Sequence, residues 1–425
     1  MRCRHCGSEL KLLTKEKLYA PERWFPLRML VCESCWLVQT EDFTEADKLF
    51  DADYAYFSGF SKSWLSHCER YVLEMIDRFD LNQDSYVVEV GANDGCLLQY
   101  FRNHSIPCLG IEPTASTAVT ARLKAIPIVE EFFGSVLAKK LLDQGKCADL
   151  IVANNVLAHV PNINDFVTGF AILLKPQGVA TFEFPHLVKL IAGSQFDTIY
   201  HEHFSYLSLT AANQIFNANG LSIFDVEEQP THGGSLRVFT QRQDSGKYSI
   251  NTNVTKLLAQ ELQIGICETN YYTNFQRKVN QIKNNFLTFL LEAQRQQKIV
   301  VGYGAAAKAN TLMNYAGVRP DLIPFVVHCS LVKQGKFMSG SQTPIVDESY
   351  IENTKSSYSL FVDYRVQLES LPSVYGQLSY TPKSLKRLYV VVFPWNLKKE
   401  ILAQPEYVRD WGGSFVVAIF QLEVL

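Results

Sequence analysis

The stretch "VVEVGANDG", residues 87–95, has the pattern of a buried strand that ends in a tight turn before a helix. Gly91 and Gly95 stand where the backbone must pass close to a ligand. Further apolar strands alternate with amphipathic helices downstream, at residues 107–113, 126–133, 148–157 and 178–187. This alternation predicts a parallel sheet covered by helices on both faces. We therefore expect a Rossmann-like α/β domain over residues 84–250.

A second strand, glycine turn and helix begin at "KIVVGYGAAAKANTLMNYAG", residues 298–317. The apolar runs "LIPFVVH", "YVVVFPWN" and "GSFVVAIF" follow it. They predict a second Rossmann-like α/β domain over residues 298–425. Residues 251–297 are polar with periodic Leu, Ile and Phe, and we expect a helical connector there. Residues 354–386 form a Ser- and Tyr-rich excursion to which the pattern assigns no structure.

Two cysteine pairs near the N-terminus, Cys3 with Cys6 and Cys32 with Cys35, have C-x-x-C spacing, and 25 residues lie between the pairs. Each pair can offer two thiolates to one tetrahedral zinc ion, and a segment this short has too little core to fold unaided. Four thiolates leave no open coordination position, so we expect a structural zinc module over residues 1–45. Unrelated thiols are the alternative. An aromatic-rich linker and a helix are expected over residues 46–83.

The composition limits the classes of function. The chain has 425 residues, 47% of them hydrophobic and 20% charged, with a formal net charge of -3. This balance indicates a soluble protein with no strong attraction to nucleic acid or to an anionic membrane. The first residues lack the apolar core of a signal peptide, and no apolar run reaches the roughly eighteen residues of a membrane span. We expect a cytoplasmic protein, as a monomer or a weak homo-oligomer.

The turn after the strand at residues 87–90 favours one class of cofactor. Glu112 ends the next strand, 17 residues after Gly95, where a carboxylate accepts hydrogen bonds from ribose hydroxyls. Dinucleotide sites need a helix N-terminus that is free to hold a pyrophosphate. Asp94 in this turn would repel phosphate but can bind an ammonium group. We therefore predict S-adenosylmethionine as the cofactor, and a Rossmann-like core without this cofactor is the alternative.

Other residues at the strand ends complete the predicted cofactor site. Glu131 and Phe132 could sandwich or hydrogen-bond adenine, and Asn154 and Asn155 could contact the amino-acid part. The full predicted cofactor set is Glu89, Gly91, Asn93, Asp94, Gly95, Glu112, Glu131, Phe132, Asn154 and Asn155.

The run "YHEH", residues 200–203, supplies the groups needed to methylate a carbon next to a ketone. Such a carbon must first lose a proton, so a base and a donor to the carbonyl oxygen are required. We predict His203 as the base, Glu202 as the group that orients its ring, and Tyr200 as the donor. A helix would bring Tyr200 and His203 to one face, and a strand would put Tyr200 with Glu202 on one face and His201 with His203 on the other. Both geometries keep the groups within reach of one pocket. The alternatives are a polar turn and a metal site, for which His201 and His203 lack an obvious third ligand.

Many strings together resemble the sugar-nucleotide C-methyltransferases, among them "CRHCGSEL", "YAYFSGFSKSWLSH", "ADLIVANNVLAHVPNINDF", "QFDTIYHEHFSYLSL" and "VVGYGAAAKANTLMNY". The resemblance runs nearly end to end. It implies a zinc module, a central class I methyltransferase domain that binds S-adenosylmethionine, and a C-terminal α/β domain. It also implies a dTDP-linked 4-keto-deoxysugar as substrate, expected between the last two domains. By the same resemblance, His203 removes the C3 proton, the enolate is methylated, and His159 and Tyr54 also reach the sugar.

Four further residues are predicted to bind substrate: Tyr56, Arg237, Tyr303 and Lys308. Tyr56 could line a pocket entrance or fill the core. Lys308 could hold the diphosphate together with turn amides, or belong to a structural turn. Arg237 could bind a phosphate or form a salt bridge. Two other functions remain open from the residues, an O- or N-methyltransferase and a non-catalytic zinc-ribbon adaptor.

Overall fold

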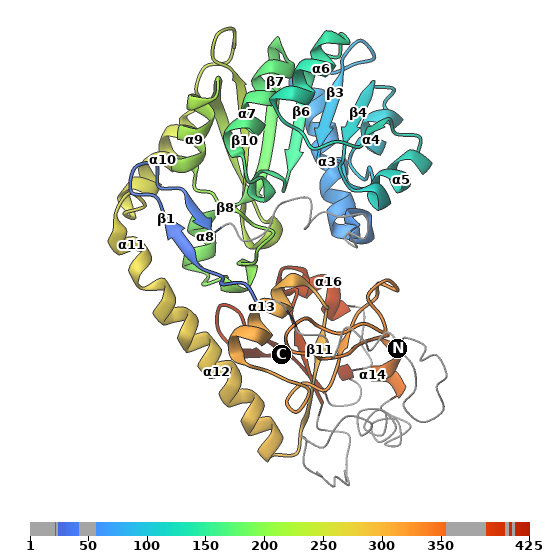
Figure 1. Ribbon diagram of the computed structural model, residues 1–425, viewed down its shortest axis with the longest axis vertical. Coiled ribbons are helices and arrows are strands. Elements are labelled where there is room, and N and C mark those ends of the chain that lie inside the picture. Colours follow the sequence, from blue (N-terminus) through green and yellow to red (C-terminus); the bar gives the residue numbers. More distant parts are fainter. Residues whose placement is uncertain (1–21, 23, 42–56, 354–387, 404–407, 410–412) are drawn as a thin grey trace, which may run out of the picture. The chain divides into compact units, whose positions relative to one another are not determined.

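The computed structural model describes residues 22, 24–41, 57–353, 388–403, 408–409 and 413–425. Contacts within the chain divide it into two compact units, each drawn in Figure 1. The central unit comprises Pro26–Gly193 and His201–Phe275, and the C-terminal unit includes Ser194–Tyr200 and Gln276–Leu425. Ser194–Tyr200, which lies inside the predicted interval 84–250, therefore packs with the C-terminal unit.

The central unit is built on a seven-stranded sheet with the order β5-β4-β3-β6-β7-β10-β9. Its strands are β3 (Val87–Val90), β4 (Cys108–Ile111), β5 (Ile128–Val129), β6 (Ala148–Asn154), β7 (Leu174–Pro185), β9 (Leu221–Gln229) and β10 (Ser235–Arg242). The strands from β5 to β7 are parallel, and β10 runs antiparallel to both of its neighbours. The strand order reverses between β3 and β6, and ligands of open α/β sheets bind at the carboxyl ends of the strands at such a point.

All residues of β3 and β4 are buried, as expected for strands that helices cover on both faces. The helices of this unit are α3 (Lys62–Phe79), α4 (Leu98–Asn103), α5 (Ala115–Leu123), α6 (Ser135–Asp143), α7 (Ile163–Leu173), α8 (Leu187–Ala192), α9 (Leu209–Ala218), α10 (Thr252–Gln263) and α11 (Thr269–Thr273) (Figure 1). The Rossmann-like α/β fold predicted for this part of the chain is confirmed.

Helix α3 shows how local sequence signals set these elements. The hydroxyl of Ser61 caps its first turn by accepting from the amide of Trp64 at 3.3 Å. Asp80 ends the helix in the left-handed conformation, with φ 53°. The buried face of the helix recurs every three or four residues and consists of His67, Cys68, Tyr71, Val72 and Met75. Two polar side chains, His67 and Tyr71, thus enter the core.

A small antiparallel sheet joins the N-terminal segment to the middle of the chain. Its strands are β1 (Met29–Val31), β2 (Val38–Thr40) and β8 (Ser205–Tyr206), in that order. Strand β2 pairs with β8 through Val38 opposite Tyr206 and Gln39 opposite Ser205. The described part of the predicted zinc module therefore contacts the residues that directly follow the "YHEH" run.

The C-terminal unit contains a six-stranded sheet with the order β13-β12-β11-β14-β15-β16. Its strands are β11 (Ile299–Tyr303), β12 (Val326–Val327), β13 (Ile345–Val346), β14 (Leu388–Val392), β15 (Ser414–Val417) and β16 (Glu423–Val424). All are parallel except β16. The helices are α12 (Phe275–Arg295), α13 (Ala307–Ala316), α14 (Ser349–Asn353) and α16 (Lys398–Ala403). The order reverses between β11 and β14, so the second Rossmann-like fold is confirmed.

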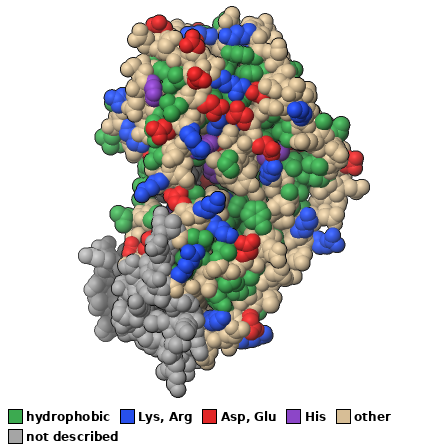
Figure 2. All heavy atoms as spheres, turned by 180° about the vertical axis from the view of Figure 1, so that it is seen from behind, with side chains coloured by type: hydrophobic (Ala, Val, Ile, Leu, Met, Phe, Trp, Pro, Cys, Tyr) green, Lys and Arg blue, Asp and Glu red, His purple; other side chains and the backbone are tan. Residues whose placement is uncertain are grey.

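The predicted helical connector, residues 251–297, contains α10, α11 and α12. Within the described part of the chain, no helix combines the length and the apolar character needed to cross a bilayer. Acidic and basic side chains are mixed on the face that Figure 2 draws.

Candidate active site

The turn after β3 needs glycine at two positions. Gly91 has φ 71°, and a Cβ added there would lie 2.4 Å from Cγ2 of Val156. Gly95 has φ 72°, and a Cβ there would lie 2.5 Å from Cδ1 of Ile126. Both conformations are strained for other residues, and both spaces are filled. The turn is thus held tightly against the sheet at the point where the strand order reverses.

Buried polar atoms gather at the carboxyl ends of β3 and β6. Among the described residues, no hydrogen-bond partner is found for Oε2 of Glu89, Oδ1 of Asp94, either side-chain polar atom of Asn154, or Oδ1 of Asn155. Strands β3 and β6 are direct neighbours in the sheet. Native interiors leave few such atoms unsatisfied, so a cluster of them at a strand end indicates a ligand with polar groups.

Glu89 has the environment expected of a ligand to a cation. Burial first, and then the nearby acidic groups of Cys96, Asp94 and Glu112, raise the pKa of Glu89 well above its ordinary value. A bound ammonium group would favour the charged carboxylate and reverse this shift. The unpaired atoms of Glu89 and Asp94 therefore fit the ammonium end of S-adenosylmethionine.

Glu112 holds the glycine turn in place. Its Oε2 accepts from the amide of Asn93 at 2.8 Å, and its Oε1 accepts from the amide of Thr114 at 3.0 Å. The hydroxyl of Thr114 also donates to Oε1. A carboxylate has about four acceptor positions, so these three bonds leave about one for a ribose hydroxyl. Glu131 pairs with Lys140 at 2.6 Å, and Phe132 is 50% exposed. The adenine contacts of Glu131 and Phe132 stay predictions.

The "YHEH" run is neither helix nor strand. It forms a turn between the 3-10 helix η3 (Phe196–Thr198) and β8, so both regular geometries considered for it were wrong. His203 is buried, and its backbone carbonyl accepts from the Thr40 hydroxyl at 2.9 Å. The next residue, Phe204, donates its amide to Ala158 at 2.8 Å. Long-range contacts on both sides therefore set the turn.

His159 packs against this turn from the 3-10 helix η2 (Leu157–His159), which follows β6. Its Nδ1 lies 2.9 Å from the carbonyl oxygen of Glu202, and its ring centre lies 4.6 Å from that of His203. A carbonyl oxygen can only accept, so Nδ1 carries the proton. Burial lowers the pKa of His159 to about 4, although the bond to Glu202 acts in the opposite direction. His159 is therefore neutral near pH 7 and a weak proton acceptor, which leaves His203 as the candidate base.

The other predicted substrate residues lie in different settings. Tyr54 and Tyr56 fall outside the described residues, and Tyr200 belongs by its contacts to the C-terminal unit. Tyr303 is buried at the end of β11 and donates its hydroxyl to Glu348. Lys308, in the first turn of α13, donates from Nζ to Oδ1 of Asn396 at 2.8 Å. Their contacts with substrate stay predictions.

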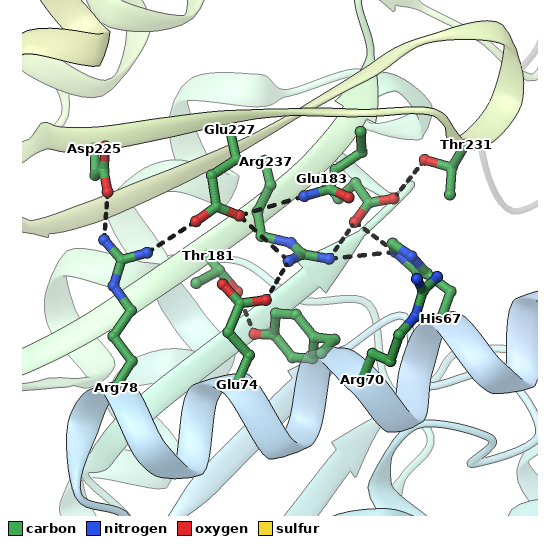
Figure 3. Close-up of polar contacts among 12 residues, drawn as sticks. His67, Arg70, Glu74, Arg78, Thr181, Glu183, Asp225, Glu227, Thr231 and Arg237 are labelled. Atoms are coloured by element: carbon green, nitrogen blue, oxygen red, sulfur yellow. Dashed lines mark hydrogen bonds and ion pairs between the residues drawn. The ribbon is translucent and has the colours of Figure 1, made fainter.

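Arg237 lies in a buried ion-pair network, which is the salt bridge considered as the alternative to phosphate binding. It is 2% exposed, and its Nη2 lies 3.1 Å from Oε2 of Glu183 on the neighbouring strand β7. Its Nη1 lies 3.2 Å from Glu74 and 3.5 Å from Glu227. Figure 3 shows the guanidinium between these carboxylates, with His67 beside it and in contact with both Arg237 and Glu183. The network ties α3 to β7, β9 and β10.

The described half of the predicted zinc site has the form of a metal-binding knuckle. Cys3 and Cys6 lie outside the described residues. After Cys32, the chain turns so that the carbonyl of Cys32 accepts from Trp36 at 2.8 Å and its amide donates to Leu37 at 2.9 Å. Hydrogen bonds from the amides of Cys35 and Ser34 lower the pKa of the Cys32 thiol. Amides aimed at a thiolate sulfur fit a zinc ligand.

Sequence reasoning missed three contributors to these sites. Thr40 and Asp197 carry no local motif, and their roles depend on contacts with distant residues. Glu183 had a usable signal, because a carboxylate inside the apolar run "TFEFP" has to find a partner in the core.

Family models match three parts of the chain. The model described as "Methyltransferase domain" matches residues 64–226, and "C-methyltransferase C-terminal domain" matches residues 230–371 and 381–419. The model described as "Putative zinc binding domain" matches residues 3–50. With the glycine turn and the unpaired polar atoms of β3 and β6, these matches define a methyltransferase that uses S-adenosylmethionine.

The chain is also 31% identical over 414 residues to the C-methyltransferase NovU of Streptomyces niveus. The matched region covers 97% of this chain and 91% of NovU. The chain therefore belongs to the C-methyltransferase family.

Solved structures match less of the chain. PH0226 of Pyrococcus horikoshii is 15% identical, covers 48% of this chain and 100% of its own, and has a TM-score of 0.37. The magnesium protoporphyrin IX methyltransferase of Synechocystis with bound S-adenosylmethionine is 14% identical, with the same coverage and a TM-score of 0.34. Likenesses this weak carry no argument about function.

Proposed function

We propose that this enzyme methylates C3 of a nucleotide-linked 4-keto-deoxysugar through an enolate that His203 forms. The dTDP-linked sugar is the first substrate to test. The observation that carries the proposal is the pairing of His203 with the neutral His159. His159 lies five residues beyond Asn154, at the carboxyl end of β6 where the unpaired polar atoms gather. A buried imidazole in this position suits the removal of a proton from carbon.

The residues of the chain have distinct tasks in this reaction. His203 accepts the C3 proton, and the electron pair of the C3–H bond passes into an enolate with its charge on the C4 oxygen. Tyr200 donates a hydrogen bond to that oxygen, and Glu202 orients the imidazole. S-adenosylmethionine, when bound, supplies an electrophilic methyl group. Glu89, Asp94 and Asn154 bind its amino-acid part, and Glu112 its ribose.

The N-terminal module has a supporting task in the same proposal. Cys3, Cys6, Cys32 and Cys35 hold a structural zinc ion, which stabilises the segment that carries β1 and β2. Because β2 pairs with β8 and Thr40 donates to the carbonyl of His203, this segment fixes the turn that carries the base.

The test is to incubate the protein with S-adenosylmethionine and a panel of dTDP- and GDP-linked 4-ketosugars. Mass spectrometry should detect the gain of one methylene unit in a dTDP sugar. In deuterium oxide without the cofactor, C3 should exchange its hydrogen. Methylation on oxygen, or methylation without loss of the C3 hydrogen, would contradict the proposal.

A further inference from the structure

The segment Ser194–Tyr200 leaves the central unit just before the candidate base and packs with the C-terminal unit. The chain returns to the central unit at His201, two residues before His203. All side chains from Ser194 to Ile199 are buried. The backbone that leads into the catalytic turn is thus built into the other unit of the protein.

Three contacts hold this segment within the C-terminal unit. Oδ2 of Asp197 accepts from the indole Nε1 of Trp395 at 2.7 Å. The carbonyl of Ile199 accepts from the hydroxyl of Thr311 on α13 at 2.9 Å. The ring of Phe196 packs edge-on against that of Tyr315, with 5.5 Å between the centroids.

Trp395 also contacts Lys308 of α13. Nζ of Lys308 lies 4.1 Å from the centre of its ring and also donates to Asn396 at 2.8 Å. A cation over an indole face is attracted by the ring's negative face. Trp395, which holds Asp197 and lies in the 3-10 helix η5 (Trp395–Leu397), is therefore linked to α13 through Lys308.

Asp197 is an unusual residue for simple packing. It is 1% exposed, and no partner of its Oδ1 is found among the described residues. Burial raises the pKa of Asp197 to about 6, against the opposing effects of Lys308 and of the bond from Trp395. A buried carboxylate is unfavourable unless it is paired.

We propose that Asp197 and Thr311 are positioning residues, through which the C-terminal unit fixes the backbone that carries His203. Asp197 stands six residues before His203 and Ile199 stands four before it. Loss of either anchor would let the turn move within the chain while leaving the cofactor residues of β3, β4 and β6 in place. This inference rests on the proposed role of His203.

Two conservative variants test the anchors, Thr311→Val and Trp395→Phe. Each removes one hydrogen-bond donor. Thr311→Val keeps the shape of the side chain, and Trp395→Phe keeps an aromatic ring of smaller size. Tyr389→Phe is the matched control, because it also deletes one hydrogen bond in the C-terminal unit, that from Lys298 at 2.6 Å. In both test variants kcat and C3 deuterium exchange should fall about tenfold in parallel. The KM and the affinity for S-adenosylmethionine should not change.

Rescue separates positioning from general stability. Asp197→Asn keeps an oxygen acceptor for Trp395 and should be more active than Asp197→Ala. Backbone amide exchange over residues 199–204 should also be faster in Thr311→Val and Trp395→Phe than in Tyr389→Phe. The inference is overturned if both test variants match the control in turnover and in amide exchange.

The two proposals can fail separately. If the wild-type enzyme neither methylates a ketosugar nor exchanges its C3 hydrogen, the proposed function fails. The amide exchange of residues 199–204 still decides whether Trp395 and Thr311 hold the turn.

Discussion

The centres of the imidazole rings of His159 and His203 lie 4.6 Å apart, and Nδ1 of His159 donates to the carbonyl oxygen of Glu202 at 2.9 Å. This pairing gives the two histidines different roles. The pKa of His159 lies near 4 because the ring is buried, so it stays neutral and acts as a hydrogen-bond donor to the turn. This difference supports the proposed assignment of His203 as the base.

The first prediction concerns the pH dependence of the reaction. His159→Asn removes the donor to Glu202 and should lower kcat, but His159 does not titrate between pH 5 and pH 8, because its pKa is about 4. Any acidic limb of kcat/KM in that range should therefore keep its position in the variant. A pH profile of wild type and variant makes the measurement. If the acidic limb disappeared in His159→Asn, His159 would be the base, and the assignment of this role to His203 would be wrong.

The second prediction concerns Thr40, which donates to the carbonyl of His203. Thr40→Val keeps the shape of this buried side chain but removes its hydroxyl, and should lower kcat about tenfold by loosening the turn. Thr240→Val is the control, since Thr240 is a buried threonine that donates to the carbonyl of Ala180 within the sheet. Equal loss of activity in both variants would show that Thr40 acts only through stability.

How far the sequence predicts the site depends on the range of the contacts. The positions of Gly91 in the turn after β3 and of Glu112 directly after β4 could be predicted, because they follow from the strand, turn and helix around them. The geometry of residues 200–203 could not be predicted in this way. It is set by contacts such as that of Thr40 with His203, 163 residues away. Periodicity describes regular elements and carries no information about a turn held by distant partners.

The same limit applies to Arg237. Its phosphate and salt-bridge interpretations were equally open, since a basic residue in "HGGSLR" fits both. The structure places it beside Glu183 and Glu74, which come from a different strand and from α3. The pairing of β10 with β7 brings Glu183 to Arg237, and the packing of α3 brings Glu74.

The third prediction concerns the stability of this network. Glu183→Gln should lower the free energy of unfolding by about 3–5 kcal/mol, because Arg237 would lose its buried counter-charge. Glu228→Gln breaks an exposed pair with Lys189 and should lower it by about 0–1 kcal/mol. Chemical denaturation measures both. Similar values for the two variants would mean that the buried network adds little stability.

Glu183 should also make the free energy of unfolding fall as the solution becomes acidic. Burial would raise its pKa, but the hydrogen bond and charge of His67 and the charge of Arg237 outweigh burial and lower the pKa to about 2. The ordinary value is 4.5. The stabilisation is thus complete above about pH 4.5 and is lost as the pH falls toward 2. Over this range the stability of Glu183→Gln should depend less on pH than that of wild type.

The fourth prediction concerns zinc. Wild-type protein should contain about one zinc ion per chain, and Cys32→Ser should lose it and melt at a lower temperature. Cys329→Ser replaces another exposed cysteine and should change neither property. Metal analysis and thermal melting make the comparison. Unchanged melting of Cys32→Ser would contradict a structural zinc.

The most direct test of the central claim compares His203→Asn with His201→Asn. His201 lies two residues away and hydrogen-bonds the carbonyl of Pro26, so its loss controls for disturbance of the turn. The measurement is the exchange of the C3 hydrogen of a dTDP-linked 4-ketosugar in deuterium oxide. The exchange rate and turnover of His203→Asn should fall by about 10²–10⁴, with unchanged affinity for S-adenosylmethionine, while His201→Asn stays within a few-fold of wild type. Exchange at the wild-type rate in His203→Asn would contradict proton removal by this residue.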